Sequence, residues 1–328
     1  MNPFISVIIP VYNRTQYVGE AIDSVLKQTL DRDKFEIVVV TNVDLPERDG
    51  VKIIKSNEKW LGPKIVQGIE EARGEVISLL EDDDLFLPNK LEVMYKIFKE
   101  KEKIGLFKNL IKWINANGRE WLDPLPQEPI EVTHKDLRLD MLGDLISKYG
   151  VGFNNSSMSF RKEHIYKYLN YLNEIKLIVD KFIGFIFLFT SQVVIWNQPL
   201  SIYRVLSDSA TYKLGNLDHY LEHKRNFQKI VYEDYVTTYK ALKNTGFEEF
   251  LEKYIYFQKI IVKLLSKNKG EMKVTLKEAF KAVPLHNPKA PRWRILSAYL
   301  ASFLPYSLKK KLIFEYFYKQ ELKDLKFI

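Results

Sequence analysis

Two uninterrupted runs of apolar, largely β-branched residues constrain the fold of this chain more than any other feature of its sequence. They are FISVIIPV at 4–11 and FEIVVV at 35–40. Runs without polar alternation are typical of parallel strands that are covered on both faces. The elements predicted around them alternate in type: helix 20–30, strand 51–55, helix 65–72 and strand 75–80. This alternation predicts a doubly wound α/β sheet with right-handed crossover connections.

Polar residues follow three of these predicted strands at the point where each strand ends. They are Tyr12, Asn13 and Arg14 after the first strand, Thr41 and Asn42 after the second, and residues 81–84 (EDDD) after the fourth. Ligands of open α/β sheets bind beyond the carboxyl ends of the strands. The sequence therefore predicts that these three segments line one crevice.

Further elements are predicted up to residue 212. They are a helix at 90–101, a hairpin of strands 106–114 and 119–122 around an Asn-Gly turn, a proline-rich loop at 123–129, a strand at 151–160, an apolar helix at 182–189 and an edge strand at 193–203.

From residue 216 the pattern is helical almost to the end of the chain. The predicted helices are 216–242, 247–267, 273–282 and 292–325. We place the domain boundary near residue 212, which divides the chain into an α/β domain, 1–212, and a C-terminal α-helical extension, 213–328.

The two predicted domains differ in charge. The whole chain has a formal net charge of +8, and residues 215–328 contain 22 Lys/Arg against 12 Asp/Glu. A near-neutral part followed by a basic, aromatic-rich part indicates contact with an anionic surface. The segment RWRILSAYLASFLPYSLKKKL, which contains Pro305, suits a membrane interface; packing on the first domain or on a second subunit, as in a homo-oligomer, explains it equally well. Nucleic acid ranks third because no recognised binding motif accompanies the charge.

Composition excludes several classes of protein. The absence of cysteine excludes disulfide scaffolds, thiolate zinc sites and cysteine nucleophiles. The longest apolar stretch, Phe182 to Trp196, is shorter than the roughly 20 residues that a spanning helix needs. The first residues lack the basic region of a secretory signal. We therefore expect a cytoplasmic protein without a transmembrane helix. The basic C-terminal extension also suggests peripheral contact with the cytoplasmic face of the membrane.

The acidic cluster Glu81-Asp82-Asp83-Asp84 is the strongest candidate for chemistry. Four carboxyl groups at the end of a buried strand repel one another unless a cation or a ligand offsets their charge. Mg²⁺ and Mn²⁺ prefer a few carboxylates together with substrate phosphate oxygens, so the cluster suits a metal–nucleotide complex. The structural alternative is that Asp84 only caps the helix that starts at Pro88–Asn89.

Three segments in order carry a resemblance to a known family. ISVIIPVYNR at 5–14, FEIVVV at 35–40 and GIEEARGEVISLLEDDDLFLP at 68–88 are similar to the nucleotide-binding half of the family-2 glycosyltransferases of GT-A fold. An ordered series of motifs is more specific than any single one, and the resemblance covers about the first 210 residues. It implies a GT-A type, Rossmann-like mixed sheet and the inverting transfer of a sugar from a nucleotide diphosphate.

The resemblance assigns the donor site to the first strand and the residues after it. It implies that Tyr12 stacks on the nucleobase, that Pro10 and Asn13 line the base, and that Arg14 lies close by. Taken alone, Tyr12 is better explained as a strand-end aromatic side chain that packs on the sheet.

The resemblance also divides the roles within the acidic cluster. It implies that Asp82 holds the ribose of the sugar nucleotide and that Asp83, with Asp84 beside it, binds the Mn²⁺ or Mg²⁺ ion.

Two positions depart from the family pattern. The family usually has an acid directly after the second strand, where this chain has Thr41, so recognition of uracil by a carboxylate is not supported. Asn42 can still donate and accept hydrogen bonds to a base. The family's arginine before the second helix has no clear counterpart, and the nearest cation, Lys64, can meet a diphosphate as a point charge.

Asp180 is the predicted general base. An inverting transfer needs one carboxylate that takes the proton from the attacking acceptor hydroxyl. The family carries a Glu-Asp pair at the start of a helix and a Tyr-Arg further on; here Val179 and Asp180 precede the apolar helix, and Tyr203 and Arg204 follow later. Arg204 is expected either to close the site over the phosphates or to pair with an acid. The alternative for Asp180 is an ordinary helix N-cap.

We therefore predict a metal-dependent glycosyltransferase of hexosyltransferase type whose acceptor is a hydroxyl of a glycan or of a lipid-linked saccharide. A sugar-phosphate nucleotidyltransferase is one alternative, but its glycine-rich phosphate loop is missing. A non-catalytic nucleotide- or glycan-binding module at a membrane surface is the other. His219 and His223 stand four apart on a predicted helix, but without a third ligand nearby we do not predict a metal there.

Overall fold

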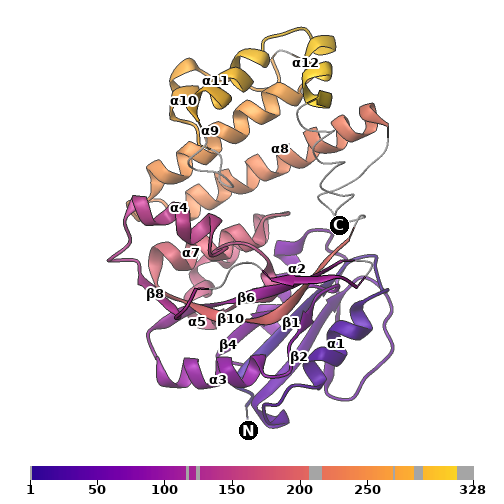
Figure 1. Ribbon diagram of the computed structural model, residues 1–328. Coiled ribbons are helices and arrows are strands. Elements are labelled where there is room, and N and C mark those ends of the chain that lie inside the picture. The colour runs from indigo at the N-terminus through magenta and orange to yellow at the C-terminus, as the bar shows by residue number, and fades with distance from the viewer. Residues whose placement is uncertain are drawn as a thin grey trace. The chain divides into compact units, whose positions relative to one another are not determined.

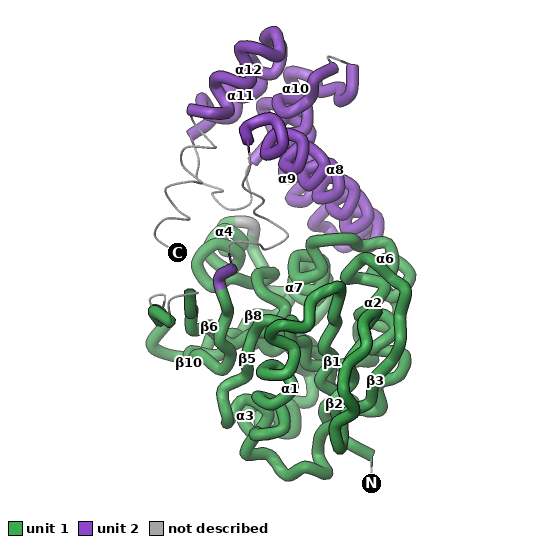
Figure 2. The backbone as a smooth tube through the Cα atoms, turned by 90° about the vertical axis from the view of Figure 1, so that its right-hand side faces the viewer, with its two compact units in different colours: residues 1–204 green, residues 205–328 purple. Residues whose placement is uncertain are grey.

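The computed structural model describes residues 2–115, 118–122, 126–206, 216–268, 270–283 and 291–315. The chain divides into two compact units, residues 1–204 and 205–328 (Figure 2). The boundary predicted near residue 212 falls between 206 and 216, outside the described residues.

Unit 1 is built on one mixed sheet whose first half is parallel (Figure 1). Strands β1 (Ile5–Val11), β2 (Phe35–Thr41), β3 (Val51–Lys55) and β4 (Val76–Leu79) lie in the order β3-β2-β1-β4, and each neighbouring pair is parallel. All residues of β1, β2 and β4 are buried. The two long apolar runs therefore form the centre of a sheet that is covered on both faces, as the sequence predicts.

Helices cover both faces of this parallel half. The helices of unit 1 are α1 (Val18–Leu26), α2 (Leu61–Glu71), α3 (Lys90–Glu100), α4 (Leu139–Ser147), α5 (Lys162–Ile165), α6 (Leu169–Glu174) and α7 (Val179–Thr190). Val7 and Ile9 of β1 pack in one cluster with α1 and α3, whereas Ile8 meets α2 on the opposite face. A Cβ built on Gly68 of α2 would lie 2.5 Å from Ile8 Cγ2, so glycine permits this close approach. The sheet is doubly wound, as predicted.

The second half of the sheet contains antiparallel pairs. It adds β9 (Met158–Arg161), β6 (Ile104–Asn115), β10 (Gln192–Val205) and β5 (Leu85–Phe86) in the order β4-β9-β6-β10-β5, with β7 (Glu120–Leu122) beside β6 and β8 (Ile130–Thr133) beside β10. The pairs β4–β9, β9–β6 and β10–β5 are antiparallel. The predicted hairpin is confirmed as β6 and β7, although residues 116 and 117 of its turn lie outside the described residues.

Two sequence predictions for this half are wrong. The strand predicted at 151–160 begins only at Met158, because residues 151–157 form a loop and a short 3-10 turn in which Asn154 has a φ of 61°. The element predicted at the edge, 193–203, is β10, which lies inside the sheet between β6 and β5. Both errors concern pairing with distant segments, which a local pattern does not contain.

Unit 2 is helical where the structure describes it. Its helices are α8 (Leu217–Ala241), α9 (Glu248–Leu265), α10 (Leu276–Lys281), α11 (Arg292–Ala301) and α12 (Tyr306–Ile313). The helix predicted at 292–325 is interrupted: α11 ends before Pro305 and α12 begins after it, because proline cannot continue the hydrogen-bond ladder of a helix. Residues 316–325 of that prediction lie outside the described residues. No described helix combines the length and the apolar character needed to cross a bilayer.

A buried carboxylate joins β1, β2 and the turn before β4. Glu36 accepts hydrogen bonds from Ser6 Oγ at 2.6 Å, from the Arg73 backbone nitrogen at 2.6 Å and from Arg73 Nε at 2.8 Å. Ser6 Oγ in turn accepts from the backbone nitrogen of Gly74 at 2.9 Å. Burial alone would raise the pKa of Glu36, but the hydrogen bonds from Ser6 and Arg73 outweigh it and hold the pKa below its ordinary value.

We expect Glu36→Gln to lower the free energy of unfolding by about 1–3 kcal/mol, because the new amide nitrogen would face a hydrogen-bond donor in a buried site. Since the folded-state pKa lies below that of the unfolded chain, the contribution of Glu36 is complete at neutral pH and is lost as the pH falls through the folded-state pKa. Urea unfolding at neutral and at acidic pH measures both effects.

The control is Glu71→Gln, which removes an exposed ion pair with Lys52 and should cost about 0–1 kcal/mol. Equal losses in the two variants, or a loss for Glu36→Gln that does not shrink in acid, would contradict this account of the buried carboxylate.

Candidate active site

The carboxyl ends of β2, β1 and β4 meet at one edge of the sheet. The three strands are parallel neighbours, so the segments that follow them start side by side. These segments are residues 12–14, 41–42 and 81–84, which the sequence singles out. Pro10 lies just inside this edge, buried in β1 opposite Val40.

Asn13 and Asn42 connect the ends of β1 and β2. The Asn13 backbone nitrogen donates to Asn42 Oδ1 at 3.0 Å, and Asn42 Nδ2 donates to Asn13 Oδ1. Asn13 has a φ of 55°, a left-handed conformation that asparagine adopts more readily than most residues. Thr41 is occupied locally, since its Oγ1 accepts from the backbone nitrogen of Val43 at 3.0 Å. Buried Thr41 therefore occupies the position where the family pattern has an acid, and the amides of exposed Asn13 and partly exposed Asn42 lie beside it.

Tyr12 and Lys64 lie together at the end of β1. Tyr12 is 39% exposed, so its ring is accessible to a ligand. Lys64 of α2 is almost fully buried; its Nζ donates to the Val11 carbonyl oxygen at 2.8 Å and lies 5.3 Å from the centroid of the Tyr12 ring. Burial lowers the pKa of Lys64, against the charges of Glu58 and Asp82. Lys64 thus fixes the strand end that carries Tyr12.

Arg14 binds two of the four acids. Its Nη2 donates to Asp82 Oδ1 and to Asp83 Oδ2, both at 2.5 Å. Burial raises the pKa of Asp82 to about 6, although Arg14 opposes the shift. The two carboxylates raise the pKa of Arg14 by more than burial lowers it, so the guanidinium stays charged.

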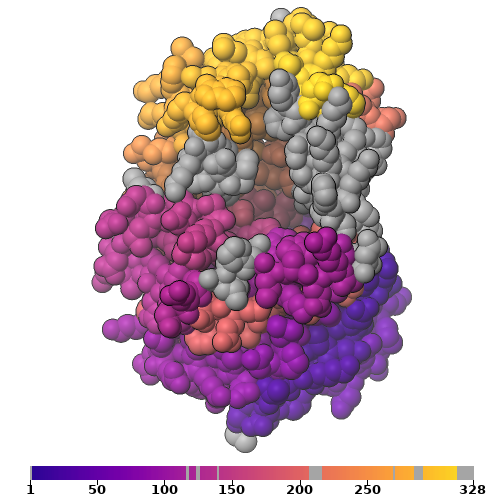
Figure 3. All heavy atoms as spheres, in the orientation of Figure 1, coloured from indigo at the N-terminus to yellow at the C-terminus, as the bar shows by residue number. Residues whose placement is uncertain are grey.

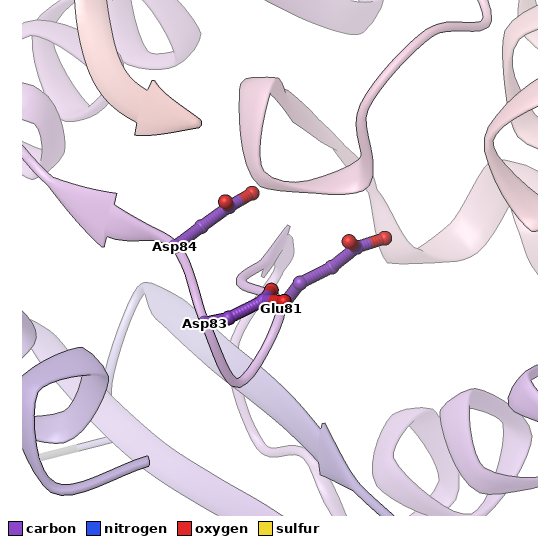
Figure 4. Close-up of side chains that lie close together, drawn as sticks. All are labelled: Glu81, Asp83 and Asp84. Carbon is purple, nitrogen blue, oxygen red and sulfur yellow. The ribbon is translucent and has the colours of Figure 1, made fainter. Parts of the chain in front are cut away.

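Glu81, Asp83 and Asp84 gather in the turn between β4 and β5 (Figure 4). Each offers one carboxylate oxygen, and these oxygens lie within 4.8 Å of one another. Burial, followed by the charge of Asp83, raises the pKa of Asp84 to about 7; burial and the charges of Asp84 and Asp83 raise that of Glu81 well above its ordinary value. Among the described residues no other group of three acids or histidines is this close, and His219 and His223 belong to none.

The segment before β9 donates hydrogen bonds to these acids. Asp84 Oδ2 accepts from Asn154 Nδ2 at 2.8 Å and from Ser156 Oγ at 2.6 Å. Asn155 Nδ2 donates to Glu81 Oε1 at 2.8 Å. Neutral donors stabilise carboxylates without cancelling their charge, so the acids keep their affinity for a cation.

Asp180 lies in the first turn of α7 and is linked to the acids through Asn154. Its Oδ2 accepts from the Asn154 backbone nitrogen at 3.2 Å, while the Asn154 side chain donates to Asp84. The charge of Asp180 also contributes to the raised pKa of Glu81. Asp180 thus places a carboxylate, the group type that can serve as a general base, beside the loop that holds Asp84.

Close packing of α7 against residues 150–153 fixes this arrangement. A Cβ built on Gly184 would lie 2.5 Å from the Cα and nitrogen of Gly152, so glycine is needed at this contact. Lys181 Nζ donates to the Gly152 carbonyl oxygen. Burial lowers the pKa of Lys181, against the charge of Asp180.

Arg204 braces the acidic turn from β10. Its backbone nitrogen donates to Asp84 Oδ1 at 2.9 Å, and its Nε donates to the Asp83 carbonyl oxygen at 2.9 Å. Its Nη2 forms an ion pair with Glu20 at 2.8 Å, and its guanidinium carbon lies 4.3 Å from the centroid of the Tyr17 ring. Of the two roles expected for Arg204, the structure displays the pairing with an acid.

An aromatic wall, formed by Trp113, Trp121, Phe153 and Tyr203, adjoins the acids. The Trp113 ring stacks on Trp121 and on Phe153, with centroids 5.8 Å and 5.7 Å apart, and Tyr203 packs edge-on to Trp113 at 5.0 Å. Burial and then the charge of Glu81 raise the pKa of the Tyr203 hydroxyl, with smaller effects of the other nearby acids. Phe153 and Tyr203 directly precede Asn154 and Arg204, which both donate to Asp84, so this end of the wall lies beside the acids.

Lys90 lies fully buried behind the acidic turn. Its Nζ donates to the Ser156 carbonyl oxygen at 2.5 Å and to Ser201 Oγ at 3.0 Å. Burial, aided by the charge of Lys108, lowers its pKa well below the ordinary value. Because Ser156 also donates to Asp84, Lys90 positions the loop that positions this acid.

The sequence interpretation missed the third acid of the cluster, the 154–156 segment and the aromatic wall. The sequence places Glu81 in the acidic run, but the resemblance assigns only Asp83 and Asp84 as metal ligands. The run NNSS at 154–157 interrupts an apolar segment. Small polar residues are poor in a buried strand and favour turns, and this was the available signal for the loop. The aromatic residues gave no signal, because core packing explains isolated aromatics equally well.

The acids fit a divalent cation. Three carboxylate oxygens converge, and two of the acids, Glu81 and Asp84, have pKa values raised by burial and mutual repulsion. Oxygen donors of this kind suit hard cations such as Mg²⁺ and Mn²⁺. The residues that would hold the ion are Glu81, Asp83 and Asp84.

Comparison with known protein families identifies the architecture. The model described as "Glycosyl transferase family 2" matches residues 6–169, half of the chain. The chain belongs to glycosyl transferase family 2. The match to this family contains the ends of β1, β2 and β4 with the whole acidic cluster, and it stops before Asp180 and Arg204.

Relatives described as glycosyltransferases match part of the chain. The glycosyltransferase GlyG of Streptococcus pneumoniae is 23% identical over 226 residues, which are 64% of this chain and 73% of GlyG. An uncharacterized glycosyltransferase of Rickettsia felis is 37% identical over 108 residues, 30% of this chain and 18% of that protein. The chain matches a third or less of the length of this protein and of similar ones from Rickettsia typhi and Rickettsia bellii.

Solved structures show the same fold. S. aureus TarS 1-349 superposes with a TM-score of 0.55 at 16% sequence identity, covering 91% of this chain and 80% of that chain. The predicted GT-A type mixed sheet with a helical C-terminal region is thereby confirmed.

We expect Lys90→Met to lower the free energy of unfolding by about 1–3 kcal/mol, because it removes one of two buried donors from the Ser156 carbonyl and from the Ser201 hydroxyl. The remaining donors are Ser201 Oγ to the carbonyl and Asn109 Nδ2 to the hydroxyl. Lys96→Met, on the exposed side of the same helix, is the matched control and should change stability by less than about 0.5 kcal/mol. Chemical denaturation of both variants gives the comparison. If Lys90→Met left the free energy of unfolding unchanged, the buried amine would not hold this loop.

Proposed function

We propose that this family-2 protein is a glycosyltransferase of hexosyltransferase type. It transfers a sugar from a nucleotide-diphosphate donor to a hydroxyl of a glycan or lipid-linked saccharide, with inversion of the anomeric configuration. The observation that carries the proposal is that Tyr12, Asn13 and Asn42 lie at the same sheet edge as the acidic cluster. Asp180, in the first turn of α7, is joined to that cluster through Asn154. Family membership and the glycosyltransferase relatives support it.

The donor half of the proposal rests on the ends of β1 and β2. The accessible Tyr12 ring can stack on a base, and the side chains of Asn13 and Asn42 offer both donors and acceptors to it. Asp82, held by Arg14, is proposed to accept a hydrogen bond from the ribose. TarS structures that contain UDP-GlcNAc and UDP, superposing with TM-scores of 0.53 and 0.52, support a nucleotide-sugar donor. Because amides beside Thr41 replace the acid that usually contacts the nucleobase, binding experiments identify the nucleobase of the donor.

Glu81, Asp83 and Asp84 are proposed to hold Mn²⁺ or Mg²⁺ next to the donor. When bound, such an ion supplies positive charge to the diphosphate oxygens. The protein's own contribution is to hold the acids in place. Arg14, which follows β1, and Arg204, in β10, both donate hydrogen bonds to the turn. Lys64 and Arg204 are proposed as positioning residues of the donor site.

Asp180 is proposed as the general base. It takes the proton of the acceptor hydroxyl as the hydroxyl oxygen bonds to the anomeric carbon, and the bond from that carbon to the diphosphate breaks on the opposite face. The proton ends on Asp180 and the electron pair of the broken bond stays on the diphosphate. The aromatic wall beside the acids offers apolar ring surfaces for a saccharide acceptor.

The donor site is tested by calorimetry and thermal shift with UDP-, GDP- and dTDP-sugars, each with and without Mn²⁺ or Mg²⁺. We expect one donor to bind only with metal and to stabilise the protein by about 2.7 kcal/mol at one hundred times its dissociation constant. Asp83→Ala should abolish this effect, whereas Asp33→Ala, an exposed acid, should keep it. Absence of binding by every donor would reject the donor site.

The base is tested by Asp180→Asn. General bases contribute about 10²- to 10⁴-fold, so turnover should fall by that factor while donor affinity stays unchanged. Asp140→Asn, an exposed acid in the first turn of α4, is the control. Release of nucleotide diphosphate in the presence of saccharide acceptors measures turnover. Unchanged turnover in Asp180→Asn would reject Asp180 as the base. Donor binding without any turnover in the wild-type chain would favour the non-catalytic binding module.

A further inference from the structure

We infer that the outer surface of α10, α11 and α12 docks on an anionic lipid bilayer. This docking face carries large apolar side chains from each of the three helices: Leu276, Phe280, Trp293, Leu300, Leu308 and Leu312. The inference concerns unit 2 alone and is independent of the proposed sugar transfer.

The three helices have their inner faces on the same helical pair. Ile295 and Tyr299 of α11 pack with Ala279 of α10 against Ile260 of α9. Ile313 of α12 packs against α8 and α9, in a cluster that α11 joins through its alanines. The opposite sides of α10, α11 and α12 therefore face away from α8 and α9, and the surface view shows α11 and α12, in yellow, without a described helix of unit 2 in front of them (Figure 3).

The exposed apolar side chains are concentrated on this outer side. Seven large hydrophobic residues of the described part of unit 2 are exposed, and all seven lie between 276 and 312, against three in the whole described part of unit 1. Trp293 and Leu300, each 65% exposed, are seven residues apart on α11 and so lie on one stripe. The pairs on α10 and α12 are each four residues apart, which also puts them on one side of their helix. Such a concentration marks a contact surface rather than random scatter.

Cations surround these apolar side chains. Lys277, Lys281, Arg292, Arg294 and Lys311 are exposed on the same three helices. The only acid between residues 272 and 314 is Glu278, and it is already bound by Lys259 and by the cap of α10. The face therefore combines unopposed positive charge with a tryptophan and leucines that can enter the interface between headgroups and acyl chains.

The same charge argues against the other partners. Two copies of this chain joined through the face would bring like charges together, which an isologous interface does not tolerate well. A nucleic acid would match the charge, but its phosphates would leave the leucines without an apolar environment. An anionic bilayer satisfies both components. α11 and α12 have ten and eight residues, so they can lie in the interface but cannot cross the membrane.

The test is co-sedimentation of the full chain with vesicles of equimolar phosphatidylglycerol and phosphatidylcholine, and with phosphatidylcholine alone. We expect binding to the anionic vesicles, little binding to the neutral ones, and loss of binding at high salt. The double variant Lys277→Glu/Arg294→Glu should weaken vesicle binding by at least about tenfold. The double variant Trp293→Ser/Leu300→Ser should weaken it by a similar factor.

Matched controls carry the same changes on unit 1. Lys103→Glu/Lys135→Glu and Leu122→Ser/Tyr166→Ser alter exposed residues there and should bind vesicles like the wild-type chain. Circular dichroism confirms that each variant is folded before it is scored. Failure to bind anionic vesicles, or equal losses in face and control variants, would overturn the inference. A dimer in solution that Trp293→Ser/Leu300→Ser converts to a monomer would overturn it in favour of an interface between copies.

Discussion

The mutual repulsion of carboxylates in the turn between β4 and β5 is the constraint on which the rest of unit 1 depends. Three neighbouring segments donate hydrogen bonds that offset this repulsion. They are Arg14 at the end of β1, the polar residues before β9, and Arg204 of β10. Arg14 and Arg204 are 68 and 120 residues away from the acids that they bind. The order of strands in the sheet brings them to one place, so the fold and the site depend on the same pairing.

This compensation is incomplete, which is why the turn is a candidate cation site. The guanidinium of Arg14 binds Asp82 and Asp83, whereas Asp84 and Glu81 receive hydrogen bonds from neutral groups and keep raised pKa values. Acids held close together at such a cost retain affinity for a cation. Functional sites commonly store unfavourable interactions that the surrounding structure enforces, here through Lys90 and the close packing of α7.

How much could be predicted from the sequence depended on the range of the interactions involved. The parallel strands were predictable because a strand that is buried on both faces needs apolar residues at every position. The place of the polar residues after them was predictable because neighbouring parallel strands end at the same edge of the sheet. The loop at 151–157 and the interior position of β10 were not, because both depend on which distant strand is the neighbour. Thr41 shows the limit of motif matching: its hydroxyl closes the end of β2, and the amides of Asn13 and Asn42 stand beside it.

The sequence by itself determined the doubly wound parallel half of the sheet, the identity of the acidic residues at its edge and the basic, helical character of the C-terminal part. Only the tertiary structure decided that Asn154 joins Asp84 to Asp180, that Glu81 completes the group of acids, and that leucines of α10, α11 and α12 stay exposed. The physical reason is that local patterns record whether a residue is buried and in which kind of element. They do not record its partner, which long-range strand pairing and helix packing select.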